Sequence, residues 1–176
     1  MKKIALSLVI VSTLAMAGGL TLKSNTLDGQ LTTAQEFNGF GCSGANISPE
    51  LQWSKAPQGT KSYAITVYDK DAPTGSGWWH WVVVNIPLSI HKIKEGASGS
   101  KKLPQGALET TTNFGQPGFG GACPPKGDSA HAYAFTIHAL DIEKLPVESK
   151  SNPALVGYMI NQHTLQKATI TSYYKR

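Results

Sequence analysis

Apolar and polar residues alternate along several short stretches of this chain, which is the period-two pattern of β-strands that bury one face. Glycine, proline and small polar residues separate these stretches, as expected for turns. The alternation predicts strands at residues 20–23, 39–44, 48–53, 61–69, 80–86, 131–140 and 168–174.

Two of these strands bring polar side chains to one end of a sheet. The apolar face of the strand 61–69 continues to Asp69 at its end, and the strand 80–86 begins with His80. The residues of the second strand that share a face are His80, Val82, Val84 and Ile86. If the two strands are antiparallel neighbours, Asp69 and His80 lie at the same end of the sheet.

One helix is expected late in the chain. After the polar stretch 149–153, Leu155 and Met159 follow helical spacing, which predicts a helix over about 154–166. The segment 87–112 resembles a loop. Many short strands with one late helix predict a mainly β fold, a β-sandwich with a small helical addition near the C-terminus.

The first 17 residues have the pattern of a signal peptide. Two lysines precede an apolar run over residues 4–14, and Ala15 to Ala17 form the small-x-small pattern of a cleavage site. A membrane anchor is the alternative, but this run of about a dozen residues is shorter than the roughly 20 that span a bilayer. We expect cleavage after Ala17, a single domain over residues 18–176 without a membrane span, and a periplasmic or secreted protein.

The charge of the chain argues against one class of partner. The formal net charge is +5, and it falls to +3 (5 − 2) when the two leader lysines are removed. The remaining lysines are scattered, without the dense basic stripe that nucleic acid binding usually needs. Nucleic acid is therefore not an expected partner.

The two cysteines, Cys42 and Cys123, have two interpretations. In an oxidising compartment an even pair most simply forms one disulfide, here closing a loop of about 80 residues. The alternative is a nucleophilic cysteine with His131 as its base, which requires a free thiol.

The stretch from Asp69 to Pro87 concentrates the groups that carry chemistry. It holds two carboxylates, one histidine and three tryptophans, although Asp and His must be solvated or paired whereas Trp favours burial. We interpret this stretch as one wall of a small binding site. Trp78 is expected on that wall, whereas Trp79 and Trp81 are expected to pack in the core or sheet on the face opposite His80.

The glycine- and proline-rich segment 113–127 also has two interpretations. It lacks the strand before and the helix after that a dinucleotide-binding fingerprint requires. It is either a long surface loop or a rim whose backbone N–H groups contact an anion.

Several motifs together resemble the phosphatidylethanolamine-binding protein (PEBP) family, and more narrowly its bacterial Raf-kinase-inhibitor-like branch in exported form. The resemblance covers nearly all of the chain after the leader. The motifs are Asp69-x-Asp71-Ala72-Pro73, Trp78-x-His80-Trp81 continuing to Pro87, Pro124-Pro125-Lys126-Gly127, and His131-x-Tyr133-x-Phe135.

The resemblance implies a Greek-key β-sandwich of PEBP type with a small pocket at one end for an anion such as phosphate or a phosphorylated headgroup. Asp69, Trp78, His80 and His131 would line the pocket, Asp71 and Tyr133 would be neighbours, and Gly121 with its flanking backbone would form the rim. The pair Cys42 and Cys123 fits what exported members carry. The family implies no cofactor and no metal.

Two residues depart from the family pattern. Lys70 stands where proline is common, and Ala132 stands where arginine is usual. Alternation places Ala132 on the face opposite His131, so we expect the pocket to be retained.

The residues alone support the same chemistry. If His80 and His131 meet Asp69 at one end of the sheet, the imidazoles can donate to an anion, and binding would tighten as pH falls through the histidine range. The alternative is a metal-dependent enzyme with a two-His one-carboxylate site. A hydrolase lacks support because no Gly-x-Ser-x-Gly elbow is present. A protein partner at the pocket rim and a homodimer remain open.

Overall fold

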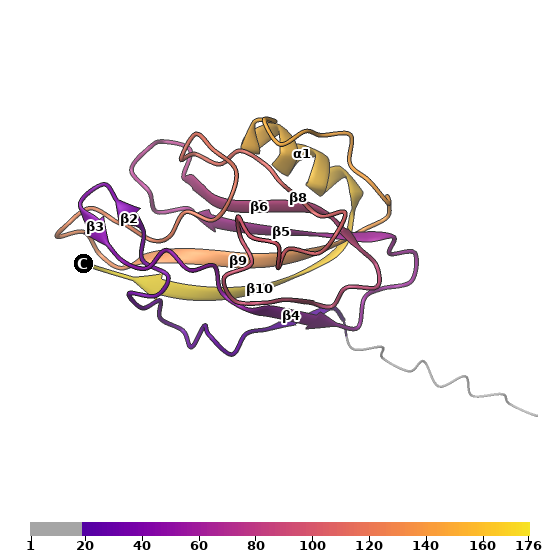
Figure 1. The fold of residues 1–176 in the computed structure, drawn as a ribbon, viewed down its shortest axis with the longest axis horizontal. Helices are drawn as coiled ribbons and strands as arrows, with labels where there is room; N and C mark the ends of the chain where they lie inside the picture. The colour runs from indigo at the N-terminus through magenta and orange to yellow at the C-terminus, as the bar shows by residue number, and fades with distance from the viewer. Residues whose placement is uncertain (1–18) are drawn as a thin grey trace, which may run out of the picture.

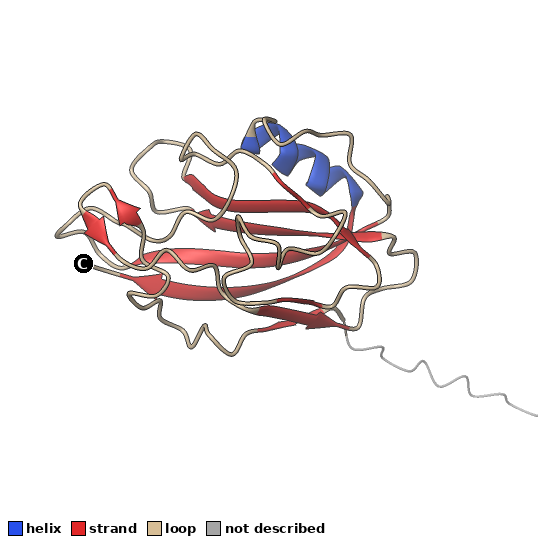
Figure 2. Ribbon diagram, in the orientation of Figure 1, coloured by secondary structure: helices blue, strands red, loops and turns tan. Residues whose placement is uncertain are grey.

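The computed structural model describes residues 19–176, so the predicted signal peptide lies outside the described residues. Strands dominate the fold, and a single short helix lies near the C-terminus (Figures 1 and 2). The elements are β1 (Thr21–Lys23), β2 (Asn38–Gly39), β3 (Cys42–Ser43), β4 (Leu51–Ser54), β5 (Ser62–Asp69), β6 (Trp78–Pro87), β7 (Lys92–Ile93), β8 (Leu108–Glu109), β9 (His131–Leu140), α1 (Pro153–His163) and β10 (Thr164–Tyr174).

Two antiparallel sheets enclose the main core. The larger sheet has the strand order β10-β9-β5-β6-β8, and the smaller has the order β1-β4-β7. Trp53 of β4 packs in one buried cluster with Ile65 of β5 and Phe135 of β9. Burial of this apolar surface between the sheets is the dominant stabilising contribution, and the predicted β-sandwich is confirmed.

Helix α1 covers the other face of the large sheet (Figure 1). Val156 and Ile160 pack in a second cluster with residues of β5 and β6. The helix begins where the Asn152 side chain accepts a hydrogen bond from the Ala154 N–H, with Pro153 in the first turn. It ends at His163, three residues before the predicted end, because β10 starts directly at Thr164.

The short elements differ from the sequence prediction more than the long ones. Strand β9 has the predicted bounds, and β5 begins one residue later than predicted. The predicted strand 39–44 is instead the hairpin β2–β3, with Phe40 and Gly41 at positive φ in its turn. Strands β7 and β8 lie in the segment that was predicted to be loop, and each has only two residues.

Strand β6 contains two irregularities that change the predicted faces. At its start, Trp79 pairs with Tyr68 and Trp81 pairs with Val67, which leaves His80 without a partner on β5. Such a β-bulge breaks the alternation and re-aims side chains. The prediction that Trp79 and Trp81 share a face is therefore wrong: Trp81 lies in the core between the sheets, and Trp79 packs on the α1 side.

The second irregularity lies near the end of β6. Ile86 pairs with Tyr63 and Val83 pairs with Ile65, so two residues of β6, the second of them Asn85, oppose one residue of β5. Asn85 has φ 58°, a left-handed conformation that asparagine tolerates better than most residues. Ile86 therefore turns into the core between the sheets with Val83, whereas Val82 and Val84 pack on the α1 side, so the predicted shared face of Val82, Val84 and Ile86 is wrong.

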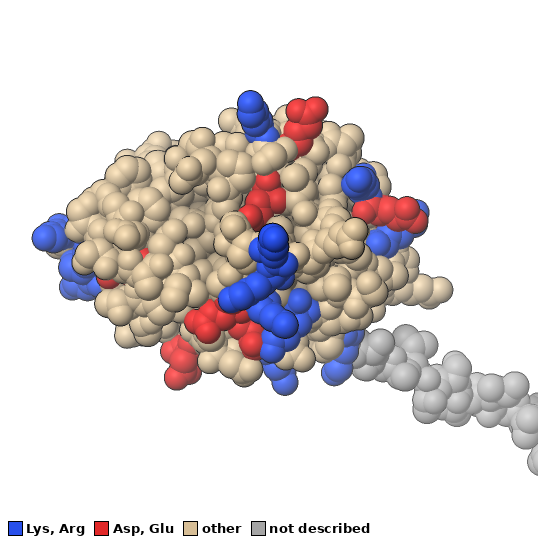
Figure 3. Space-filling view, in the orientation of Figure 1, with Lys and Arg blue, Asp and Glu red and all other residues tan. Residues whose placement is uncertain are grey.

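The surface agrees with the charge analysis. Lysine and arginine side chains lie interspersed with aspartate and glutamate on the visible face (Figure 3). Among residues 19–176, no helix is long and apolar enough to cross a membrane.

Candidate functional site

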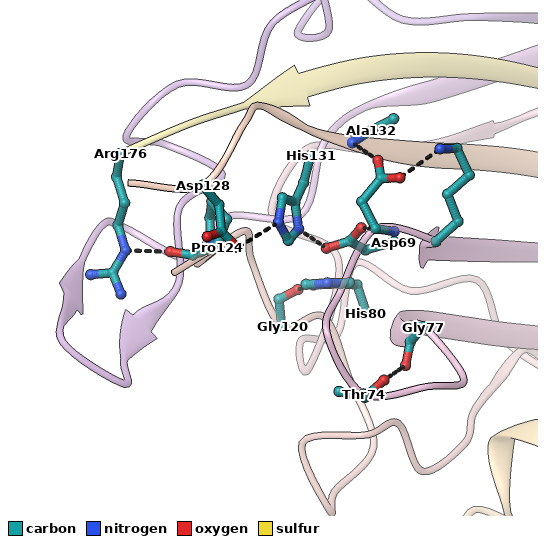
Figure 4. A network of polar contacts seen from close by, with 12 residues as sticks. Asp69, Thr74, Gly77, His80, Gly120, Pro124, Asp128, His131, Ala132 and Arg176 are labelled. Atoms are coloured by element: carbon teal, nitrogen blue, oxygen red, sulfur yellow. Dashed lines mark hydrogen bonds and ion pairs between the residues drawn. The ribbon is translucent and has the colours of Figure 1, made fainter. Parts of the chain in front are cut away.

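Three strands bring the candidate residues to one end of the large sheet. Strand β5 ends at Asp69, which pairs with Trp78 at the start of β6 and with Tyr133 near the start of β9. The expectation that Asp69 and His80 lie at the same end is therefore confirmed. His131, the first residue of β9, lies at this end as well (Figure 4).

A cavity of about 160 Å³ opens between these strand ends and the neighbouring loops. It contains all four residues that the family resemblance predicts on its lining, and it is present with Ala132 at the position of the usual arginine. The lining residues are Phe40, Asp69, Ala72, Pro73, Thr74, Trp78, His80, Phe114, Cys123, Pro124, Pro125, His131 and Tyr133.

The most buried polar pair of the cavity joins Asp69 and His131. Nδ1 of His131 lies 2.7 Å from Oδ2 of Asp69, and both side chains are almost completely buried. The other oxygen, Oδ1, accepts a hydrogen bond of 2.8 Å from the Asp71 N–H. A carboxylate held in this way fixes the orientation of the imidazole and keeps a proton on Nδ1.

Asp128 is a charged neighbour that the sequence analysis missed. Its Oδ2 lies 3.5 Å from Nε2 of His131, so His131 stands between two carboxylates (Figure 4). Asp128 is about half exposed. In the sequence, only the position of Asp128 three residues before His131 could have indicated that the two side chains meet. Asp128 lies in a loop, whose conformation cannot be predicted from a periodic pattern.

His80 enters the cavity through the first bulge of β6. Its Nδ1 donates to the Gly120 carbonyl at 2.7 Å, and the Gly120 N–H donates back to the His80 carbonyl at 2.8 Å. The side chain is only 4% exposed, and this burial lowers the pKa of His80 from 6.5 to about 4. His80 is therefore neutral at neutral pH, and its Nε2 is an acceptor.

Tyr133 lies beside Asp69 at the inner end of the cavity. Its hydroxyl is fully enclosed and forms no hydrogen bond of good geometry with the residues that the structure describes. Burial, followed by the charge of the Asp69 carboxylate and a hydrogen-bonding contact with it, raises the pKa of Tyr133, so the hydroxyl keeps its proton. The Asp69 carboxylate is therefore the nearest acceptor for this hydroxyl.

Asp71 and Gly121 do not line the cavity. Asp71 pairs with Lys70 and accepts a hydrogen bond of 2.9 Å from the Ala132 N–H. Both contacts lower the pKa of Asp71, and the contact with Lys70 has the larger effect. The Gly121 N–H donates to Asn46 Oδ1 at 2.7 Å, so it is not free for an anion. A Cβ at Gly121 would collide with the Gln35 backbone. Asp71 thus ties β5 to β9, and Gly121 packs behind the cavity.

Aromatic side chains form much of the wall. The Phe114 ring lies 5.5 Å from the Trp78 ring and 5.9 Å from the Phe40 ring, centroid to centroid. Phe40 is 70% exposed at the tip of the hairpin β2–β3. Neither phenylalanine is among the predicted site residues, although each lies beside glycine in a polar segment, where an exposed aromatic ring is a usable signal.

The two cysteines form the predicted disulfide, with their Cα atoms 6.0 Å apart. The bond joins the hairpin β2–β3 to the loop before β9, and Cys123 itself lines the cavity. Arg176 strengthens the same junction by donating to the Pro124 carbonyl (Figure 4). It also donates to the Gly41 carbonyl in the turn of the hairpin. Because both thiols are bonded, the alternative of a nucleophilic cysteine is wrong.

The site gives no support to the metal-dependent alternative. Within residues 19–176, no group of three or more His, Cys, Asp or Glu side chains is arranged to hold a metal ion. The Asp69 carboxylate already accepts hydrogen bonds on both oxygens.

Comparison with known proteins gives consistent results. A family model described as phosphatidylethanolamine-binding protein matches residues 23–175. The chain is 50% identical over 181 residues to the UPF0098 protein YbcL of Escherichia coli strain K12, which covers 99% of each chain. It is 49% identical over 158 residues to the UPF0098 protein YbhB of the same organism, covering 88% of this chain and 99% of the relative. The crystal structure of E. coli YbcL, described as a member of the mammalian PEBP family, matches with a TM-score of 0.88 and 52% identity over 90% of this chain and 99% of that chain.

Proposed function

This chain belongs to the phosphatidylethanolamine-binding protein family, and from that premise we propose that its cavity binds a small anion such as phosphate or a phosphorylated headgroup. The volume of about 160 Å³ suits one phosphate group with a short substituent. The proposal concerns binding and assigns no catalytic residue.

The observation that carries the proposal is the buried Asp69–His131 pair on the wall of the cavity. Asp69 holds Nδ1 of His131 at 2.7 Å, so Nε2 is the ring nitrogen left for a ligand. A hydrogen bond between a charged donor and an anionic oxygen is stronger than one between neutral groups.

The two histidines add complementary groups. When His131 is protonated, its Nε2–H can donate to the anion while Asp69 holds Nδ1 in place. His80 remains neutral and offers Nε2 as an acceptor, which suits a ligand that also carries a donor, such as the ammonium of an ethanolamine headgroup. The aromatic wall formed by Phe40, Phe114 and Trp78 excludes water and strengthens these interactions.

Calorimetric titration with glycerophosphoethanolamine tests this function. This phosphodiester keeps a constant phosphate charge between about pH 5 and 8, so changes in affinity report on the protein. We expect saturable binding at one site, reduced at least about tenfold in His131→Gln, because a lost charged hydrogen bond is worth about 1.5–3 kcal/mol. His91→Gln, an exposed histidine outside the cavity, is the control and should bind as the wild type does. Absence of binding, or equal binding by His131→Gln, would contradict the proposal.

The proposed place of action is outside the cytoplasm. The signal-peptide pattern of residues 1–17 and the disulfide between Cys42 and Cys123 support it together. N-terminal sequencing of the protein recovered from the periplasm should begin at Gly18, and recovery of an uncleaved cytoplasmic chain would contradict this placement.

A regulatory role through a protein partner is a second candidate, and Phe40 favours it. Phe40 is 70% exposed beside the cavity, and its own backbone has φ 53°. Capture of a partner by the wild type but not by Phe40→Ser would support the role. Capture that is unaffected by Phe40→Ser would count against a partner surface at this rim.

A further inference from the structure

A second cavity lies toward the other end of β6. Its volume is about 450 Å³, within the range of small-molecule sites. It is lined by Asn85 of β6, residues 106–108 at the start of β8, and residues 144–148 in the segment that leads to α1 (Figure 1). Asn85 lies seven positions after Trp78, about 23 Å along a strand, and the two cavities share no lining residue.

Asn85 is directed into this cavity by the second bulge of β6. Its side chain is 6% exposed, and its Oδ1 accepts a hydrogen bond of 2.8 Å from the Leu145 N–H. Because an N–H can bond only to the oxygen of the amide, this contact fixes which atom is Oδ1 and which is Nδ2.

The amide nitrogen of Asn85 lacks a partner. Nδ2 donates to no group within residues 19–176, and it is not one of the fully enclosed polar atoms. Since Asn85 lines the cavity, its N–H groups open into it. A donor on a nine-tenths buried side chain that faces a cavity can anchor a ligand through a carbonyl or carboxylate oxygen.

Charged and apolar groups complete the lining. Lys144 and Glu148 flank the cavity, and neither forms an ion pair with a residue of the described part of the chain. Between them lie apolar surfaces of Leu108, Leu145 and Val147. An amide donor, one cation and one anion beside apolar surface are complementary to a zwitterion that carries an apolar body.

We propose that this second cavity binds a free α-amino acid with an apolar side chain. The carboxylate accepts from Asn85 Nδ2 and pairs with Lys144, and the ammonium pairs with Glu148. The side chain packs against Leu108 and Val147. This site is independent of the function proposed for the first cavity.

Titration of ¹⁵N-labelled protein with leucine, followed by NMR, tests the proposal. We expect saturable shifts of the Asn85 side-chain amide and of the Gly106 and Ala107 backbone amides, with the amides around Asp69 unmoved. 4-Methylpentanoate, which lacks the ammonium group, should bind several-fold more weakly, as should 4-methylpentanamide, which also lacks the carboxylate. The absence of saturable shifts at Asn85, or equal affinity for all three compounds, would overturn the proposal.

Asn85→Asp is the most informative variant. An aspartate keeps an oxygen for the Leu145 N–H but replaces the donor with an acceptor, so leucine affinity should fall at least about tenfold. Lys144→Met should also weaken binding. Because Lys144 is exposed, this variant should fold normally and tests the site even if Asn85→Asp does not fold. Lys150→Met is the matched control outside the cavity. Wild-type affinity in both Asn85→Asp and Lys144→Met would overturn the assignment.

Discussion

Nδ1 of His131 lies 2.7 Å from Oδ2 of Asp69 at the point where β9 begins and β5 ends. Both side chains are buried, and the Asp71 N–H holds the second oxygen of Asp69. The ring of His131 therefore has one orientation, with Nδ1 committed to Asp69 and Nε2 left for Asp128 or a ligand. This arrangement supports specific predictions about binding and stability.

Removing the Asp128 charge should strengthen anion binding. Oδ2 of Asp128 lies 3.5 Å from Nε2 of His131 and would repel an anion that approaches the same nitrogen. Asp128→Asn should raise the affinity for glycerophosphoethanolamine by about three- to tenfold, since a partly exposed charge pair is worth about 1 kcal/mol. Titration calorimetry measures the effect, and weaker binding by Asp128→Asn would show that Asp128 contributes to the site instead.

The free energy of unfolding should fall as pH drops from 7 toward 4. Burial lowers the pKa values of His80 and His138 from 6.5 to about 4. Between these values the unfolded chain binds more protons than the folded chain, so stability is complete above pH 6.5 and declines on acidification. Each histidine contributes a loss of up to about 3 kcal/mol.

His138 allows a clean test of this decline. It lies outside the cavity, where Nε2 contacts the Thr66 hydroxyl at 3.1 Å. Urea unfolding of the wild type and of His138→Gln at pH 7 and pH 4.5 should show a stability difference that shrinks at the lower pH. A difference that stays constant would contradict the assigned direction.

Loss of the disulfide should reduce both stability and binding. Cys42 and Cys123 are 81 residues apart, and closing a loop of this length stabilises the fold by about 4 kcal/mol in the chain-entropy model. The double variant Cys42→Ser with Cys123→Ser should unfold at lower urea concentration. It should also bind glycerophosphoethanolamine more weakly, because the hairpin that carries Phe40 is released. Unchanged binding would show that the hairpin is not needed for the site.

Much of the fold follows from local pattern. The long strands β5 and β9 are buried and strongly alternating, so their period identified them and placed Asp69 and His131 correctly. The two-residue strands β7 and β8 have no period to detect, and they exist only because β4 and β6 offer open edges to them.

The two bulges of β6 could not be predicted from local pattern. Alternation cannot foresee an extra residue, because a bulge is set by packing on both faces of the sheet. His80 was identified from its motif, but its route into the cavity depends on the first bulge, and the orientation of Asn85 depends on the second. Asp128 and Phe114 reach the cavity from loops, where sequence alone does not specify position.

Calorimetric titration of the His131→Gln variant with glycerophosphoethanolamine tests the central claim most directly. The change removes the buried imidazole that Asp69 holds at 2.7 Å on the cavity wall, so the affinity should fall at least about tenfold. His91→Gln, outside the cavity, should bind as the wild type does. Equal affinity of His131→Gln and the wild type would contradict the assignment of this cavity as an anion site.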